Sequence, residues 1–160
     1  MPRKLRRTKK RESGAVLIEF TFVILPMFAL IFLTIDTAWL IFGRACLQEA
    51  VREGVRFGVT GQLATGCSGL NCSIKKTVQT YSFGFVTSSN ASSVVQIHYY
   101  SPATLTEVTG ASASIGGNVV QVSVQGLSLV PLAPLWRSSG ALTLNASSSD
   151  VMESGTNAAP

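Results

Sequence analysis

Residues 15–42 read AVLIEFTFVILPMFALIFLTIDTAWLIF, and Glu19 and Asp36 are the only ionisable side chains in this stretch. Folded as an α-helix, the stretch would extend over about 42 Å, more than the roughly 30 Å hydrocarbon layer of a bilayer. Its charge-free part, residues 20–35, would cover about 24 Å of that layer. Glu19 and Asp36 would then lie near opposite edges of the membrane. We therefore predict one membrane-spanning helix over residues 15–43.

Charged residues are scarce in this chain, and the positive ones gather at its start. Only 13% of the residues are charged, against roughly 25% in soluble domains, which favours a membrane or assembly protein. Residues 1–14 contain seven Lys or Arg side chains against Glu12 alone, in a chain of net charge +5. Cations beside an apolar helix remain on the cytoplasmic side. We therefore expect a basic cytoplasmic leader and an exported remainder. The leader has no aromatic side chain to stack on bases, so no nucleic-acid partner is expected.

Two other kinds of apolar segment fit less well. A cleaved secretory signal has an apolar core of about 7 to 15 residues followed by a small-x-small site. The apolar core here is longer, and it ends in the bulky residues 39–42. Cys46 follows a Gly-Arg-Ala sequence that faintly resembles a lipoprotein site, and Arg44 argues against that interpretation.

The apolar pattern becomes one-sided after Gly43. Small and apolar residues recur at helical spacing, while charged and polar residues occupy the other face. This stripe consists of Leu47, Ala50, Val51, Gly54, Val55 and Gly58. We predict one long helix over about residues 15–59, with an amphipathic second half at residues 44–59. Small residues at four-residue spacing would permit close packing against that half.

The rest of the chain favours a small antiparallel sheet. Apolar and polar residues alternate in three segments, which are residues 94–100, 119–125 and 142–146. Residues 74–81 could form a short helix, and the prolines in residues 131–134 exclude a central strand there. Residues 147–160 are rich in Ser, Gly and Asn and are expected to fray at their end. The predicted class is α+β, with an exported head over residues 44–150, its sheet within residues 94–147, and a flexible carboxyl terminus over residues 151–160.

The junction between leader and apolar helix resembles a known processing signal. Gly14 and Ala15 are followed by an acid at the fifth position after the glycine, Glu19, and then by Phe20. This pattern resembles a class III, type IV pilin-like signal of the short-leader Flp type. Pro26 within the apolar helix and the run AVREGVR at residues 50–56 extend the likeness. Residues 11–60 are thus similar to the TadE-like pseudopilins of the tight-adherence pilus system.

The resemblance implies a fold, a place and partners. The fold would be pilin-like, and a membrane prepilin peptidase would cut between Gly14 and Ala15. The product would be a minor subunit needed for pilus assembly, crossing the bacterial inner membrane once and possibly entering the pilus. Its partners would be that peptidase, other pilin and pseudopilin subunits, the inner-membrane assembly platform and lipid. A TadF-like or TadG-like role stays open.

Cleavage would give Glu19 a possible partner of opposite charge. Ala15 would carry a free ammonium group, and Glu19 would lie four residues on, along the same helix face. Both charges are costly in lipid unless they are paired. The resemblance implies that Glu19, beside Phe20, meets the terminal amine of a neighbouring subunit and sets the helix register. Pairing with its own Ala15 stays open.

Asp36 and Pro26 are two further features of the predicted membrane segment. Asp36 is expected to face headgroups and water at the membrane edge, and pairing with a partner helix is the alternative. Pro26 removes one backbone hydrogen bond and is expected to mark a place where the helix can bend.

The exported part contains a cysteine pair but no recognisable catalytic motif. Cys67 and Cys72 lie on the oxidising side of the membrane by the predicted topology, so a disulfide is expected. A metal site would need ligands beyond these thiols and His98, and we expect neither metal nor cofactor. His98 has no evident acidic orienter in the sequence, so no enzyme is expected. The alternative to a pilin is an uncleaved single-pass anchor that presents an exported binding domain.

Overall fold

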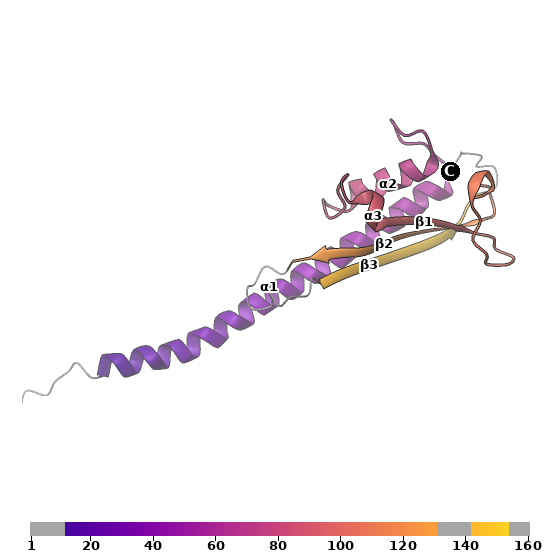
Figure 1. The fold of residues 1–160 in the computed structure, drawn as a ribbon. Coiled ribbons are helices and arrows are strands. Elements are labelled where there is room, and N and C mark those ends of the chain that lie inside the picture. The colour runs from indigo at the N-terminus through magenta and orange to yellow at the C-terminus, as the bar shows by residue number, and fades with distance from the viewer. Residues whose placement is uncertain (1–11, 131–141, 154–160) are drawn as a thin grey trace, which may run out of the picture.

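The computed structural model describes residues 12–130 and 142–153, and it has one long helix with a small head on its second half (Figure 1). The elements in chain order are α1 (Glu12–Val59), α2 (Leu70–Tyr81), α3 (Ala91–Val94), β1 (Val95–Tyr100), a 3-10 turn (Gly110–Ser112), β2 (Val119–Leu129) and β3 (Leu142–Val151). The predicted α+β class, with a long amino-terminal apolar helix and a small antiparallel sheet, is confirmed.

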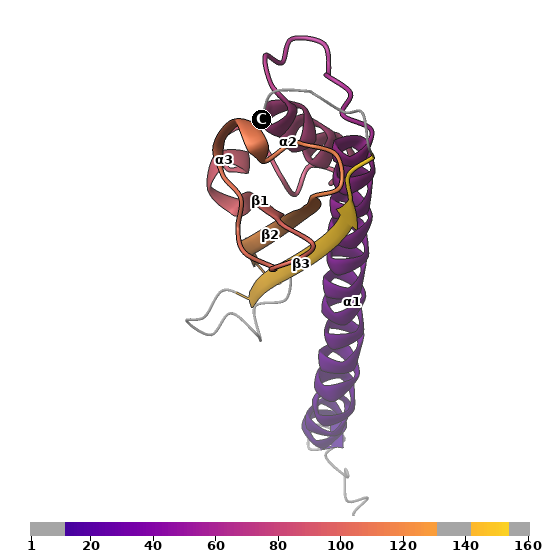
Figure 2. The same cartoon turned by 90° about the vertical axis from the view of Figure 1, so that its right-hand side faces the viewer.

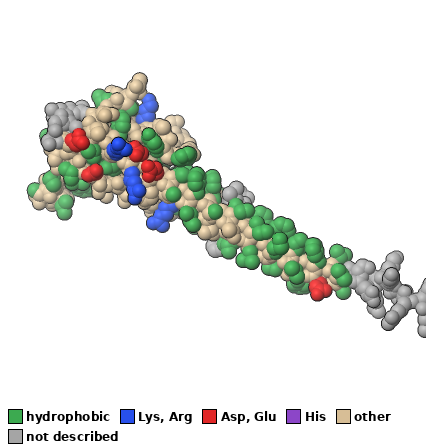
Figure 3. Space-filling view, turned by 180° about the vertical axis from the view of Figure 1, so that it is seen from behind, with side chains coloured by type: hydrophobic (Ala, Val, Ile, Leu, Met, Phe, Trp, Pro, Cys, Tyr) green, Lys and Arg blue, Asp and Glu red, His purple; other side chains and the backbone are tan. Residues whose placement is uncertain are grey.

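Helix α1 contains 48 residues, so it extends over about 72 Å. Its first half is uncovered, and Phe22, for example, is 78% exposed. In its second half the predicted stripe is buried, with Leu47, Ala50 and Val51 fully inaccessible. One helix therefore presents apolar side chains to the surroundings along one half and to a protein core along the other. Figure 3 shows the same division, with hydrophobic side chains along the rod and Lys and Arg on the head.

The three strands form one antiparallel sheet in the order β1-β2-β3. Strand β2 is central, and Val122 pairs with Ile97 of β1 and with Ser148 of β3. Val120, Val122 and Val124 are fully buried on one face of β2, and the sheet lies beside α1 (Figure 2). A register shift after Val124 places Gly126 at a φ of 69°, a left-handed conformation that favours glycine.

Two glycines let α2 approach α1 closely. A Cβ atom added at Gly54 would lie 2.6 Å from Val78 Cγ2, and one at Gly58 would lie 2.9 Å from Ile74 Cδ1. Real Cβ atoms do not approach other carbons so closely, because interiors are already close-packed. Tyr99 of β1 also joins this side of the head, since its hydroxyl donates to Asn71 Oδ1 at 2.7 Å. Burial raises the pKa of Tyr99 to about 12.

Several elements extend beyond their predicted bounds. Helix α1 begins at Glu12 instead of residue 15, α2 begins at Leu70 instead of residue 74, and β2 continues to Leu129. The third strand was predicted over residues 142–146, and β3 continues beyond that segment to Val151. Met152 is buried, and its N–H donates to the carbonyl of Asn118 at 2.8 Å. Residues 131–134 and 154–160 lie outside the described residues.

We expect Gly54→Leu to lower the free energy of unfolding of the head by about 3 kcal/mol, because the added side chain overlaps Val78. The measurement is urea unfolding of the detergent-solubilised protein, followed by near-ultraviolet circular dichroism. Gly14→Leu is the matched control, since a Cβ at Gly14 meets nothing within 4 Å. Equal midpoints for the two variants would contradict the packing role of Gly54.

Candidate processing and assembly site

Gly14 lies in the first turn of α1, and no packing contact explains why the residue is glycine. A Cβ added there would meet no atom within 4 Å, in contrast to Gly54 and Gly58 in the same helix. Gly14 is also absent from the residues with positive φ. The described structure would therefore accept a side chain at this position. A requirement for glycine here must come from something other than the fold of this chain.

Glu19 and Phe20 lie one turn further along the uncovered half of α1. Both side chains are exposed, as is Ala15. Ala15 and Glu19 are four residues apart in one helix, so they share a face at about 5 to 6 Å between their Cβ atoms. Within residues 12–130 and 142–153, neither ion pair of the structure involves Glu19. The geometry therefore leaves the carboxylate accessible both to the amine that the predicted cleavage would create at Ala15 and to a group on another chain.

Pro26 lies beside an open groove on the same part of α1. The helix continues through Pro26 without interruption. Proline has no N–H to donate, so the carbonyl of Phe22 loses its helical partner. The groove is apolar and is lined by Leu17, Ile18, Thr21, Phe22, Leu25 and Pro26. The predicted processing and assembly residues are thus gathered within about four turns at the free end of the helix.

The comparison with known families matched the same end of the chain. Residues 14–56 match the family model of TadE-like protein. The match covers roughly a quarter of the chain and contains Gly14, Ala15, Glu19, Phe20 and Pro26. The resemblance inferred from residues 11–60 is confirmed. No curated protein and no solved structure gave a match to the chain.

The TadE-like match supports association with the tight-adherence pilus machinery. Helix α1 is also long and apolar enough, from Gly14 to Val59, to cross a membrane by length and composition. The match ends at Arg56, close to the end of α1, so the head beyond α1 lies outside it.

Asp36 lies within the TadE-like segment, and the structure corrects its expected environment. The side chain is only 5% exposed and has an interaction partner, so it does not face water as predicted. Contacts between the head and α1 begin near this level. The rings of Trp39 and Phe85 lie 5.6 Å apart, and a Cβ at Gly43 would lie 3.1 Å from Leu129 Cδ1. The head therefore covers α1 from before residue 44, the predicted boundary.

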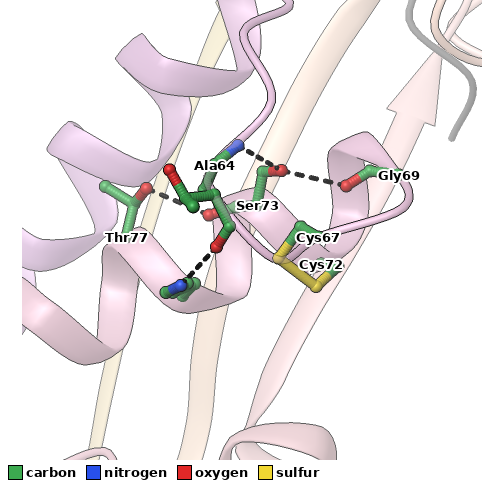
Figure 4. The surroundings of a disulfide bond; sticks show 8 residues. Ala64, Cys67, Gly69, Cys72, Ser73 and Thr77 are labelled. Atoms are coloured by element: carbon green, nitrogen blue, oxygen red, sulfur yellow. Dashed lines mark hydrogen bonds between the residues drawn. A yellow bond between two sulfur atoms is a disulfide. The ribbon is translucent and has the colours of Figure 1, made fainter.

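Cys67 and Cys72 are joined by a disulfide at the start of α2, with their Cα atoms 5.5 Å apart (Figure 4). Ser73, next to Cys72, is fully buried. Its hydroxyl accepts the N–H of Ala64 at 2.9 Å and donates to the carbonyl of Gly69 at 3.0 Å. The bridge and this serine together close the α1–α2 loop onto the first turn of α2. Cys46 is a free, buried thiol.

Sequence reasoning missed one polar pair in the head. His98 Nδ1 lies 2.6 Å from Glu107 Oε1, so the imidazole does have an acidic neighbour. Both side chains are partly exposed, and among the described residues no hydroxyl is hydrogen-bonded to the imidazole. A catalytic triad needs such a nucleophile. Within the described residues there is also no group of three or more His, Cys, Asp or Glu side chains that could hold a metal ion.

We expect the double variant Cys67→Ser/Cys72→Ser to be less stable than the native chain by about 2 kcal/mol, because the bridge closes a short loop in the unfolded state. Urea unfolding of the detergent-solubilised protein measures this difference. A reductant should lower the midpoint of the native protein by the same amount and leave the double variant unchanged. If the reductant left the unfolding midpoint of the native protein unchanged, the disulfide would make no contribution to stability.

Proposed function

We propose that the chain is a minor, TadE-type pilin-like subunit that a prepilin peptidase cuts between Gly14 and Ala15. The observation that carries this proposal is the division of α1. Its second half completes the core of the head, whereas its first half is uncovered on all sides and bears Glu19 near its end. An apolar helix without a covering needs lipid or other helices around it. Such a helix is suited to move from a bilayer into a bundle of like helices.

The chemistry of the proposed assembly step rests on Glu19 and the new amino terminus. Cleavage supplies an ammonium group on Ala15, and both charges gain from pairing when water is excluded. In the monomer the two groups share one helix face. In the assembly, Glu19 would instead meet the amine of a neighbouring subunit, while Phe20 and the groove beside Pro26 receive apolar side chains of that neighbour. Pairing of these charges would set the axial register between helices.

The proposed place is the bacterial inner membrane, crossed once, with the basic leader in the cytoplasm and the head on the outer side. The partners are the peptidase, other pilin and pseudopilin subunits and the assembly platform. The role is structural: we propose neither catalysis nor a cofactor. The second candidate is an uncleaved anchor that presents the head as a binding domain, and it is favoured by exposed polar side chains on the sheet, such as Gln96, Ser147 and Ser149.

Gly14→Leu should abolish processing while leaving the fold intact. The side chain has room in the folded protein, so an effect on cleavage reports on the peptidase and not on packing. Terminal peptide mass spectrometry of the protein extracted from membranes measures the outcome. We expect the native chain to begin at Ala15 and the variant to retain its leader. A native chain that keeps Met1 would contradict the pilin proposal and favour the anchor.

Glu19→Gln should be inserted and cleaved normally but should fail to assemble. Removing the charge leaves the amine of the neighbour without its partner in an apolar setting. A loss of one such pair lowers assembly by about tenfold or more. The measurement is the amount of pili at the cell surface, and of partner subunits recovered with the chain.

The matched control is Glu49→Gln, which removes an exposed carboxylate from the head half of the same helix. It should assemble normally. Normal pili in Glu19→Gln cells would contradict the register role of Glu19.

A further inference from the structure

An aromatic cluster marks the level at which the head meets the uncovered half of α1. Trp39 and Phe42 come from α1, and Phe83 and Phe85 come from the turn after α2. The ring centroids of Trp39 and Phe85 lie 5.6 Å apart, and those of Phe42 and Phe83 lie 6.3 Å apart. This interfacial aromatic cluster joins two segments that are distant in the sequence.

Phe83 is held in an unusual conformation at the edge of the cluster. It has a φ of 51° and is 75% exposed. A left-handed conformation is costly for a bulky L residue, and exposure of a large aromatic ring adds a second cost in water. The next residue, Gly84, also has a positive φ, of 86°. Strain of this kind persists where the surroundings enforce it.

Ser82 stabilises the turn that contains Phe83 through hydrogen bonds. Its side chain is fully buried, and its hydroxyl oxygen accepts the N–H of Val86 at 3.1 Å. Its carbonyl accepts the N–H of Phe85 at 3.0 Å. These bonds close a tight turn that directs Phe85 onto α1 and leaves Phe83 on the outside. Residues 82–86 contain no charged side chain, so the turn can leave water without losing the hydration of an ion.

The position of the cluster along α1 matches the thickness of a membrane. Phe20 and Phe42 are separated by about 33 Å along the helix axis, close to the roughly 30 Å hydrocarbon layer. When Glu19 lies at one edge of that layer, Trp39 and Phe42 lie at the other. Aromatic side chains are enriched at membrane interfaces, where an apolar ring can enter the headgroup region. Trp39 and Phe42 are 38% and 47% exposed, so the rest of the head leaves room for lipid beside them.

We propose that Phe83 inserts, beside Trp39 and Phe42, into the headgroup region on the outer side of the membrane that α1 crosses. This insertion docks the head against the lipid surface. The occupant of this surface is the same bilayer that α1 crosses. Two anchored points, the helix and the turn, would fix the tilt of the head over the membrane. The proposal rests on the membrane-spanning part of the proposed function and is independent of cleavage and assembly.

Nitroxide labels on the full chain test this docking. The variant Phe83→Cys is labelled and reconstituted, at low protein content, in vesicles of phosphatidylcholine and phosphatidylglycerol. Collisions of the label with oxygen, which concentrates in lipid, and with a water-soluble nickel chelate are then measured by electron paramagnetic resonance. Background labelling is measured on the native chain, where Cys46 is buried and Cys67 is bonded to Cys72.

Leu105→Cys is the matched control. Leu105 is also 75% exposed and has a φ of 53°, but it lies in the β1–β2 connection. That connection lies at the end of the head away from the uncovered half of α1 (Figure 1). Phe28→Cys, on the uncovered half of α1, is the reference for a label in lipid.

We expect the oxygen-to-nickel ratio at position 83 to be several-fold higher than at position 105 and to approach that at position 28. Equal ratios at 83 and 105, with a high ratio at 28, would overturn the docking and leave the membrane span intact. A low ratio at 28 as well would overturn both. The label at position 83 could also be protected from the nickel chelate only at high protein content. That result would overturn the proposal and favour a contact between subunits.

Discussion

The close approach of α2 and β2 to Gly54 of α1 is the contact on which the rest of the structure depends. A Cβ at Gly54 would lie 2.6 Å from Val78 of α2 and 3.8 Å from Val122 of β2, so both layers converge on one backbone position. The absence of side chains at Gly54 and Gly58 allows this convergence. Because the head is packed on α1 itself, the half of α1 under the head and the uncovered half belong to one continuous helix, and a shift of that helix moves the head with it.

The free end, the middle and the far end of α1 therefore differ in their surroundings. The free end bears exposed apolar side chains and the carboxylate of Glu19. These apolar side chains favour lipid or a bundle of helices around this end. The middle, at Trp39 and Phe42, lies where the head first touches the helix. The far end is tied to the segment just after β3, because the N–H of Glu153 donates to the carbonyl of Val59 at 3.3 Å. A register set near Glu19 would therefore be transmitted to the head through one continuous backbone.

Much of the fold and of the candidate site could be predicted, and the errors have identifiable causes. The strand over residues 142–151 was predicted too short, because its Ser-rich end carries no apolar alternation. Pairing with β2 extends it, since Ser147 lies opposite Ser123 and its backbone groups are satisfied by the neighbouring strand. Asp36 was expected at a wet membrane edge, because local hydropathy does not show how far the head descends along α1. Phe83 was overlooked, since a single phenylalanine between Ser82 and Gly84 resembles an ordinary turn.

The sequence by itself predicts features that are local and periodic. Hydrophobic run length predicts the span, charge asymmetry predicts its orientation, and spacing of Gly14 and Glu19 indicates the processing motif, because each depends only on neighbouring residues. The tertiary structure alone decided which glycines serve packing, since Gly54 has Val78 against it while Gly14 has open space. It also decided that Asp36 is buried and that Phe83 lies beside Phe42. These outcomes depend on contacts between segments that are far apart in the chain, and no local pattern encodes them.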